Sequence, residues 1–307
     1  MQLSGIPIGL HQNCYHQPIY SMKRFTSLLA VCACFLSTAW AQNKDYSFKE
    51  TYEASVPFQV DLSSFDGNID LTAAEGNKVE VFYIVKRNNT TLEVSRKELE
   101  KDFILEVTPT ANSLTIHIKN KKELNFHGNN RTYVNFRIAV PRETSSRLHT
   151  SDGNVSVDGT HGSVDIKTSD GNIQLGNITG NVESSTGDGN IELSLVNGNI
   201  SVRSSDGDIS FRNVSGSVKA ITSDGNIRGN LVELRRELSA KTGDGNIDVT
   251  VPDHLGLDLS IKGESLKVPL TNFTGTSDDN AIQGKLNGGG VPVTLTTSDG
   301  HIKVSYL

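Results

Sequence analysis

The sequence has few of the residues that stabilise small disulfide-rich or helical proteins. Among 307 residues there are three cysteines, two methionines, one tryptophan and eight prolines. The cysteines, Cys14, Cys32 and Cys34, all lie near the start of the chain. A disulfide framework or a cysteine-bound zinc ion is therefore excluded from the rest of the chain. The dominant residues are glycine, threonine, serine, asparagine, valine and isoleucine, which favour strands and tight turns.

The sequence also lacks a basic character and the motifs of common enzymes. The formal net charge is −6, whereas nucleic-acid binders need a basic patch that displaces counterions from phosphates. We therefore expect no nucleic-acid partner. There is no G-x-S-x-G, no phosphate-binding loop, no dinucleotide-binding glycine pattern and no H-E-x-x-H. The sequence thus offers no candidate catalytic residue and no cofactor-binding residue.

A candidate export signal occupies residues 1–41. Met22-Lys23-Arg24 precedes the apolar run Leu28 to Leu36, and Ala39-Trp40-Ala41 places small residues where a signal peptidase cleaves. We expect cleavage after Ala41, with Met22 as an alternative start of translation. The run is too short to cross a bilayer, so we expect no transmembrane segment in the mature chain. Removing Lys23 and Arg24 changes the formal net charge to −8.

Two other interpretations of this segment stay open. Leu28 to Leu36 can be a buried strand of the fold, and Cys32 or Cys34 can be a site of lipid attachment. The lipoprotein interpretation is weakened by Val31, because a small residue is expected before the lipidated cysteine. The basic start and the A-x-A ending together favour export. The predicted location is the periplasm, the cell surface or the medium.

The central part of the chain repeats the phrase T-S-D-G-N-I. Copies begin at residues 150, 168, 186, 204 and 222, a spacing of 18 residues, and another begins at 242 after 20 residues. Outlying copies begin at Ser64 and Thr297. Such regularity is typical of a stacked repeat architecture. The predicted turn ladder consists of Asp152, Gly153, Asp170, Gly171, Asp188, Gly189, Asp206, Gly207, Asp224, Gly225, Asp244 and Gly245.

Each 18-residue unit divides into two halves of nine residues. A weaker G-[NS]-[IV] signature, as at Gly162 and Gly180, lies nine residues from the main phrase. After each turn the apolar residues alternate, as in Ile173 and Leu175, which is the period of a half-buried strand. Glycine is expected where the chain turns sharply and a Cβ would clash, with Asp or Asn bonding nearby backbone groups. Each half is therefore predicted to be one strand and one turn.

Two arrangements of these halves are compatible with the repeat. One is an antiparallel meander, for which Asp-Gly is a hairpin signal, and the other is a parallel β-solenoid with 18-residue coils. In a solenoid, residues 18 apart lie above one another at about 4.8 Å and form columns of like residues. A meander gives no reason for the 18-residue identity to exceed the nine-residue one. We therefore favour an all-β, β-helix-like solenoid over residues 149–250.

The flanking regions are predicted to be more irregular β segments that cap the repeats. Residues 42–148 form the N-terminal β region, in which Ser95-x-x-Glu98 predicts one short helix. Residues 251–307 form the C-terminal β cap and end in a strand pair, Val293 to Thr297 and Ile302 to Tyr306. The strands predicted in the N-terminal region are Phe58 to Leu62, Val79 to Val85, Ser113 to Lys119 and Tyr133 to Val140.

The aspartate column is the feature most open to a chemical interpretation. Stacked carboxylates could collect Ca²⁺, but calcium-binding nonapeptide repeats carry G-G-x-G-x-D every nine residues, and here Asp recurs every 18 without a preceding Gly-Gly pair. A glycosidase needs two carboxylates in different environments, whereas equivalent turns give equivalent environments. We interpret the aspartates as turn formers and expect no metal and no cofactor.

Several segments resemble the bacterial putative-adhesin domain family of unknown function. They are the strand end Val140-Pro141, the stretch Leu148 to Val157, the G-[NS]-[IV] ladder and the closing stretch Leu295 to Val304. The resemblance covers about residues 55 to 307. It implies an exported β-solenoid in a bacterial envelope and brings no catalytic or binding residues. The chain departs from extended adhesins in having few coils and no visible surface anchor.

These observations predict a non-enzymatic exported envelope or surface protein, an adhesin-like scaffold that binds a macromolecule or glycan. Two alternatives remain open: a carbohydrate-active β-helix enzyme, either lyase or hydrolase, and a calcium-stabilised structural scaffold. The sequence names neither the ligand nor the oligomeric state.

Overall fold

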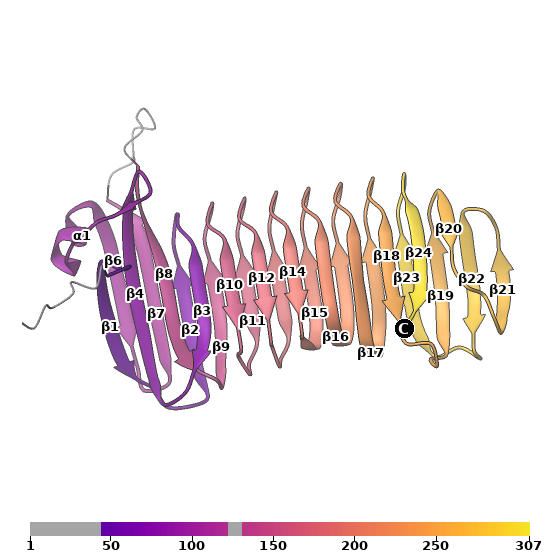
Figure 1. Ribbon diagram of the computed structural model, residues 1–307, viewed down its shortest axis with the longest axis horizontal. Helices are drawn as coiled ribbons and strands as arrows, with labels where there is room; N and C mark the ends of the chain where they lie inside the picture. The colour runs from indigo at the N-terminus through magenta and orange to yellow at the C-terminus, as the bar shows by residue number, and fades with distance from the viewer. Residues whose placement is uncertain (1–43, 122–130) are drawn as a thin grey trace, which may run out of the picture. The chain divides into compact units, whose positions relative to one another are not determined.

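The computed structural model describes residues 44–121 and 131–307. Within them, 24 strands belong to one connected sheet and a single short helix accompanies it (Figure 1). The prediction of an all-β protein is confirmed. The predicted leader, with Ala41 and the three cysteines, lies outside the described residues. No helix in the described part of the chain is long and apolar enough to span a membrane.

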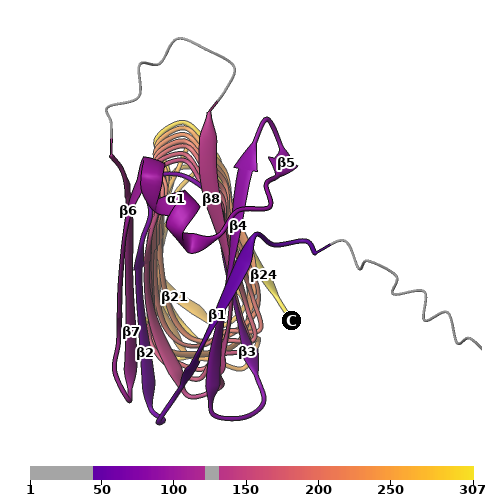
Figure 2. The ribbon, with the colours of Figure 1, turned by 90° about the vertical axis from the view of Figure 1, so that its left-hand side faces the viewer.

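Backbone pairing arranges the strands of residues 44–307 as two ladders that face each other (Figure 2). Ladder A runs through β1 (Phe48–Glu53), β4 (Lys78–Arg87), β8 (Thr132–Pro141), β3 (Ile69–Ala74), β10 (Val155–Asp158), β12 (Ile173–Gly176), β14 (Ile191–Ser194), the first parts of β16 (Ile209–Ile221) and β17 (Ile227–Lys241), β18 (Ile247–Val251), β24 (His301–Tyr306) and β20 (Ser265–Lys267). The two-residue β5 (Thr90–Thr91) pairs with β4.

Ladder B forms the opposite side. It runs through β6 (Phe103–Pro109), β7 (Ser113–Asn120), β2 (Phe58–Ser63), β9 (Thr144–His149), β11 (Val164–Lys167), β13 (Val182–Ser185), β15 (Asn197–Arg203), the last parts of β16 and β17, β23 (Val291–Thr296), β19 (Leu257–Lys262), β22 (Ala281–Leu286) and β21 (Phe273–Ser277). The strands predicted in the N-terminal region correspond to β2, β4, β7 and β8.

Within the repeats, neighbouring strands are parallel and their paired residues are 18 apart. Val155 pairs with Ile173, for example, and every pairing between repeats from residue 155 to residue 221 is parallel. The antiparallel meander therefore does not describe these residues. The outlying copies of the phrase join the same column, since Ile69 pairs with Val155 and Ile302 pairs with Ile247.

The core lies between the two ladders. Along each strand the side chains alternate between buried and exposed, and the buried ones are valine, isoleucine and leucine stacked in columns. Each fully buried aliphatic side chain contributes roughly 1.5 to 3 kcal/mol. A single coil buries too few of these side chains to fold alone, so the stack is stabilised by its length and by its ends.

Helix α1 (Arg96–Asp102) lies over the opening between the ladders at the N-terminal end (Figure 2). The predicted helix and its capping box are confirmed: the Glu98 backbone N–H donates to the Ser95 side chain, and the Ser95 backbone N–H donates to the Glu98 carboxylate. Leu99 on the helix and Phe103 at its C-cap are buried. The helix therefore shields the end of the core.

The C-terminal end is built differently. The predicted final strand pair corresponds to β23 and β24, which continue ladders B and A instead of covering them. Residues 257–286 form the end of the stack: β19, β22 and β21 extend ladder B, and the three-residue β20 ends ladder A.

Candidate functional site

The predicted turn ladder lies along one edge of the stack, where the chain passes from ladder B to ladder A. We call this the Asp-Gly edge. Its glycines Gly153, Gly171, Gly189, Gly207, Gly225 and Gly245 are buried, and its aspartates Asp152, Asp170, Asp188, Asp206, Asp224 and Asp244 are exposed. The structure therefore brings the predicted residues together as one solvent-facing column of carboxylates beside one buried column of glycines.

The neighbouring coil, and not the turn itself, requires these glycines. A Cβ on Gly189 would lie 2.0 Å from the backbone oxygen of Gly171, and a Cβ on Gly207 would lie 2.0 Å from that of Gly189. None of the six glycines has a positive φ. The expected Cβ clash is therefore present, but it arises from the close approach of successive coils and not from a left-handed backbone at the turn.

The first residue of the phrase supplies buried hydrogen bonds between coils. The Thr186 hydroxyl lies 2.9 Å from the backbone oxygen of Gly171 and 3.3 Å from that of Ser169, and it accepts the Gly189 N–H at 3.2 Å. Sequence reasoning missed this role. The signal was the restriction to threonine or serine, the two small residues with a hydroxyl. Equivalent bonds to carbonyls of the preceding coil are made by Thr168, Ser204, Thr222, Thr242 and Thr297.

The residue after Asp-Gly forms a second polar column. The Asn172 side-chain oxygen accepts the Asn190 backbone N–H at 2.8 Å, and the Asn190 oxygen accepts the Asp208 N–H at 2.8 Å. The same contact recurs from Asn135 at one end to His301 at the other. Asparagine and aspartate fit because both place an oxygen within reach of the next coil.

The opposite edge, where ladder A returns to ladder B, has a mainly aliphatic buried column. Ile178, Val196 and Val214 lie there, fully buried. Thr160 occupies the first position of this column, and its buried hydroxyl has no hydrogen-bond partner among the described residues. Packing therefore takes the place of hydrogen bonding at the buried positions of this edge, whereas exposed side chains such as Asn181 and Asn199 still bond one coil to the next.

One residue of the opposite edge has a strained backbone. Asn177, Leu195 and Asn213 occupy equivalent positions with φ of 53°, 56° and 54°, and Gly159 precedes them with φ of 79°. Glycine and asparagine tolerate this left-handed conformation, whereas it costs other residues about 1–2 kcal/mol. Leu195 is also 52% exposed. It is therefore an unfavourable residue at this position on two counts.

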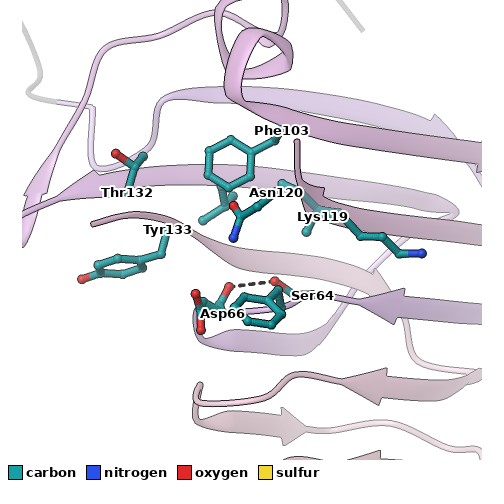
Figure 3. Close-up of a pocket in the computed structure, with 10 residues that line it drawn as sticks. Ser64, Asp66, Phe103, Lys119, Asn120, Thr132 and Tyr133 are labelled. Atoms are coloured by element: carbon teal, nitrogen blue, oxygen red, sulfur yellow. Dashed lines mark hydrogen bonds between the residues drawn. The ribbon is translucent and has the colours of Figure 1, made fainter. Parts of the chain in front are cut away.

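The aspartate column ends at Asp66. The Arg131 guanidinium lies 2.6 Å from Asp66 Oδ2 and 3.5 Å from Asp152 Oδ2. Burial raises the pKa of Asp66, although Arg131 acts in the opposite direction. Asp66 Oδ1 is buried and has no partner among the described residues, and it lies beside a 10 Å³ cavity that Ser64 and Tyr133 help to line (Figure 3). This volume accommodates about one water molecule, so the cavity is too small for an organic ligand.

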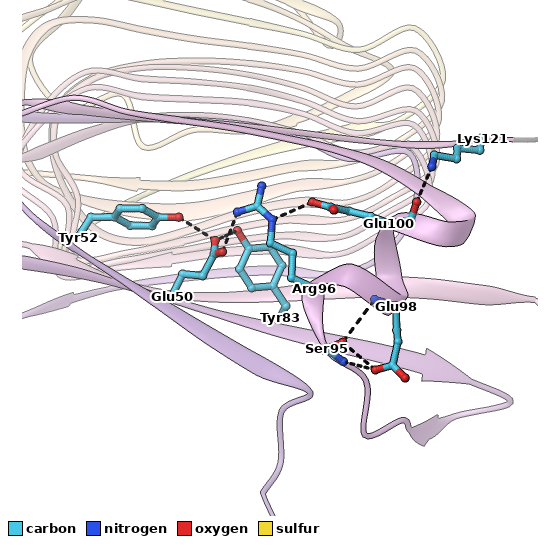
Figure 4. A network of polar contacts seen from close by, with 8 residues as sticks. All are labelled: Glu50, Tyr52, Tyr83, Ser95, Arg96, Glu98, Glu100 and Lys121. Carbon is cyan, nitrogen blue, oxygen red and sulfur yellow. Dashed lines mark hydrogen bonds and ion pairs between the residues drawn. The ribbon is translucent and has the colours of Figure 1, made fainter.

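A polar network fastens helix α1 to ladder A (Figure 4). Glu50 accepts the hydroxyl protons of Tyr52 at 2.7 Å and Tyr83 at 2.9 Å, and its other oxygen lies 2.8 Å from Arg96, which also pairs with Glu100. Burial acts to raise the pKa of Glu50, but these partners outweigh it and the pKa lies below its ordinary value. Every group has a partner within the network, which indicates a structural role.

A shallow groove of 340 Å³ crosses the outer face of ladder A over β10, β12 and β14. A Cβ on Gly176 would lie 2.5 Å from Asp158 Oδ1, so the glycine allows the Asp158 carboxylate to lie over β12 at this position. The Asn177 amide donates to Asp158 Oδ1 at 2.7 Å. The polar side chains that line the groove belong to Ser156, Asp158, Gln174, Asn177, Glu192, Ser194 and Arg212. We call this the outer groove.

Two other hollows are less suited to binding. One of 510 Å³ borders Lys267, His301 and Lys303 at the C-terminal end, and one of 420 Å³ borders Arg131, whose guanidinium is already paired with carboxylates. The 510 Å³ hollow is also lined by strands, β24 and the three-residue β20, but these lie at the end of the stack. The outer groove instead crosses consecutive strands of the regular repeats, whose pairing fixes the backbone positions of its residues. Over residues 44–121 and 131–307, no three His, Asp or Glu side chains gather in a way that could hold a metal ion.

Comparison with known proteins agrees with this description. The chain matches the family described as Toastrack DUF4097 over residues 58–305. It belongs to this family. The predicted resemblance is thereby confirmed, and the match covers the stack of this Toastrack protein from β2 to β24. No curated protein matches the chain.

Two solved structures are similar to this Toastrack chain over most of its length. One is a putative adhesin from Bacteroides fragilis, with 11% identity and a TM-score of 0.44, covering 85% of this chain and 96% of that one. The other is a putative cell adhesion protein from Clostridium sporogenes, with 13% identity and a TM-score of 0.25, covering 85% and 99%.

Proposed function

We propose that this Toastrack protein is a non-enzymatic exported scaffold that binds a glycan of the cell envelope in its outer groove. In this proposal the repeats act as a parallel β-solenoid with 18-residue coils, and the mature chain works in the periplasm, at the cell surface or in the medium. The outer groove is the single observation that carries the proposal. The predicted division at residues 148 and 250 separates the binding repeats from their two caps.

The chemistry of the groove favours a carbohydrate. Carboxylate, amide and guanidinium groups are planar and present paired hydrogen-bonding atoms, which suit the adjacent hydroxyls of a sugar. Asp158, Gln174 and Arg212 supply one of each type. Small-molecule pockets are mostly apolar and enclosed, whereas this groove is polar and shallow. It therefore suits a segment of a polymer better than a small isolated ligand.

The arrangement of the strands supports binding without rearrangement. Gln174 and Glu192 are paired residues of β12 and β14, in the regular parallel register of ladder A. Side chains on paired strands lose less freedom on binding than side chains on loops, and this lowers the entropic cost of association. In this proposal the polar side chains on the paired strands bind the glycan without a rearrangement of the backbone.

A binding experiment tests the proposal. The mature chain is screened against a panel of bacterial envelope polysaccharides, and hits are titrated by calorimetry with the variant Gln174→Ala/Arg212→Ala. We expect the variant to bind roughly tenfold or more weakly, because two hydrogen-bonding groups are lost. The matched control is Gln283→Ala/Arg236→Ala, which removes an exposed glutamine and an exposed arginine elsewhere.

Two outcomes contradict the proposal. If no polysaccharide binds, or if both variants bind like the wild type, the outer groove is not the glycan site. If new reducing ends or unsaturated sugars appear during incubation, the protein is an enzyme. If the new ends are saturated, as hydrolysis leaves them, Asp158 and Glu192 are the first candidates for the paired carboxylates.

A further inference from the structure

The two ends of the stack protect their strand edges to different degrees. An exposed edge pairs with other strands unless charge, proline, a bulge or a cover prevents it. At the N-terminal end, β1 carries Lys49 and Glu53, and β6 carries Glu106 and Pro109. Helix α1 also covers the core there. This end is therefore guarded against association.

Strand β21 at the C-terminal end has none of these protections. One of its edges pairs with β22, and no described strand pairs with the other. Its sequence, Phe-Thr-Gly-Thr-Ser, contains no charge and no proline, and every residue after Phe273 is exposed. In Figure 1 this strand is the outermost element at its end of the stack.

The strand is nevertheless held firmly on its paired side. A Cβ on Gly275 would lie 2.8 Å from the ring of Phe273, and one on Gly284 of β22 would lie 2.7 Å from it. The Phe273 ring thus lies across the two facing glycines. This is a known way of supporting glycines near a sheet edge. An edge held in the strand conformation is ready to pair without a further ordering cost.

We propose that two copies of this chain associate through β21, with antiparallel pairing about a twofold axis at Gly275. In this register, Thr274 of each copy lies opposite the partner's Thr276, a favourable cross-strand pair. Asp278 lies opposite the partner's Asn272, so no two charges of one sign meet. Ladder B then continues from one copy into the other.

The self-complementary register favours a second copy over an unrelated partner strand. The same strand serves both subunits, so the contact closes as a dimer and does not extend into a fibre. It also leaves the outer groove on β10, β12 and β14 uncovered, because those strands lie in ladder A, several coils away. The dimer is therefore independent of the proposed glycan binding.

Sedimentation velocity over a range of micromolar concentrations tests the association. We expect a dimer, and we expect the variant Thr274→Lys/Thr276→Lys to dimerise at least roughly tenfold more weakly, because lysines of both copies then face each other across the contact. The control Ser201→Lys/Thr294→Lys adds the same charge at exposed positions of β15 and β23 and should dimerise normally. Melting curves establish that both variants are folded.

Disulfide formation tests the register. The chain holds no cysteine after residue 34, so a mixture of mature Thr274→Cys chains and mature Thr276→Cys chains should give a mixed disulfide dimer on mild oxidation. Each variant alone should give much less, because each introduced thiol would face a threonine. A monomer at all concentrations, a dimer unaffected by the β21 lysines, or equal cross-linking of single variants would each overturn the proposal.

Discussion

The Asp-Gly edge and the opposite edge of the stack both hold successive coils together, but their buried columns do so by different interactions. At the Asp-Gly edge, buried hydroxyls such as that of Thr186 bond the backbone of the preceding coil, and Asn190 continues a ladder of side-chain amides. At the opposite edge, Ile178 and Val196 pack as an aliphatic column. A hydrogen bond requires a donor and an acceptor at a fixed distance and angle, so few residue types can replace threonine or asparagine. Aliphatic packing tolerates the exchange of one apolar side chain for another of similar volume. This difference explains why the sequence of the Asp-Gly turn is nearly identical in every repeat, whereas the sequence of the opposite turn varies more.

The largest effect is expected from Gly189→Ala. The new Cβ would lie 2.0 Å from the backbone oxygen of Gly171, and only a shift of one coil against the next could relieve the clash. We expect a loss of about 4 kcal/mol or more in the free energy of unfolding, measured by urea denaturation. The control is Asp188→Ala at the exposed neighbouring position, which should change stability by about 0.5 kcal/mol or less. If both variants lost the same stability, close contact between successive coils would not be the reason for glycine at position 189.

A reciprocal pair of isosteric changes is expected to have the next largest effect. Thr186→Val leaves the Gly171 carbonyl without its hydroxyl donor and the Gly189 N–H without its acceptor, and Val196→Thr places a hydroxyl in an aliphatic column. Each should lower the free energy of unfolding by about 1–3 kcal/mol. Thr160→Val, which removes an unpartnered hydroxyl from the same aliphatic column, should not destabilise the protein. If Val196→Thr proved neutral, the two edges would not differ in the way described.

A smaller effect of opposite sign is expected from Leu195→Asn. Asparagine tolerates the φ of 56° found there, so the variant should be more stable by about 1 kcal/mol in urea denaturation. The control is Val232→Asn, which replaces another exposed apolar residue, 46% exposed, without a positive φ. This control should not gain stability. A similar gain in both variants would attribute the effect to exposure and not to the backbone.

The smallest effect is expected from removing calcium. The aspartates of the Asp-Gly edge are exposed, and the hydrogen bonds between coils are made by buried hydroxyls and by asparagine side-chain oxygens. A chelator should therefore leave the melting temperature unchanged within error. If the chelator lowered the melting temperature and added Ca²⁺ restored it, a bound metal would stabilise this edge. The protein would then be a calcium-stabilised scaffold.

The sequence predicts those parts of the fold in which local strand, turn and capping preferences agree with the stacking of the repeats. The columns through Ile173 follow from alternation and an 18-residue period, and the helix after Ser95 follows from its capping box. Strand β21 could not be predicted in the same way, because its pairing depends on contacts between Phe273 and two glycines in different strands. Those glycines lie outside the T-S-D-G-N-I repeat, so the sequence pattern does not identify them.

The candidate site was less accessible from the sequence than the fold. The outer groove is lined by residues of successive coils, such as Asp158, Gly176 and Ser194, which lie in one column 18 residues apart. That column becomes visible only once the pairing of β10, β12 and β14 is known. The buried hydroxyl column was missed for a different reason: threonine and serine are common in strands and turns, so their regularity had an ordinary explanation.

The central claim is that a rigid repeat presents the outer groove to a glycan. It is tested most directly by following backbone amide NMR signals while an envelope polysaccharide is titrated into the mature chain. We expect saturable shifts confined to β10, β12, β14 and the start of β16, centred on Gln174 and including Arg212. Shifts concentrated on the aspartates of the Asp-Gly edge, or no saturable shifts with any envelope polysaccharide, would contradict it.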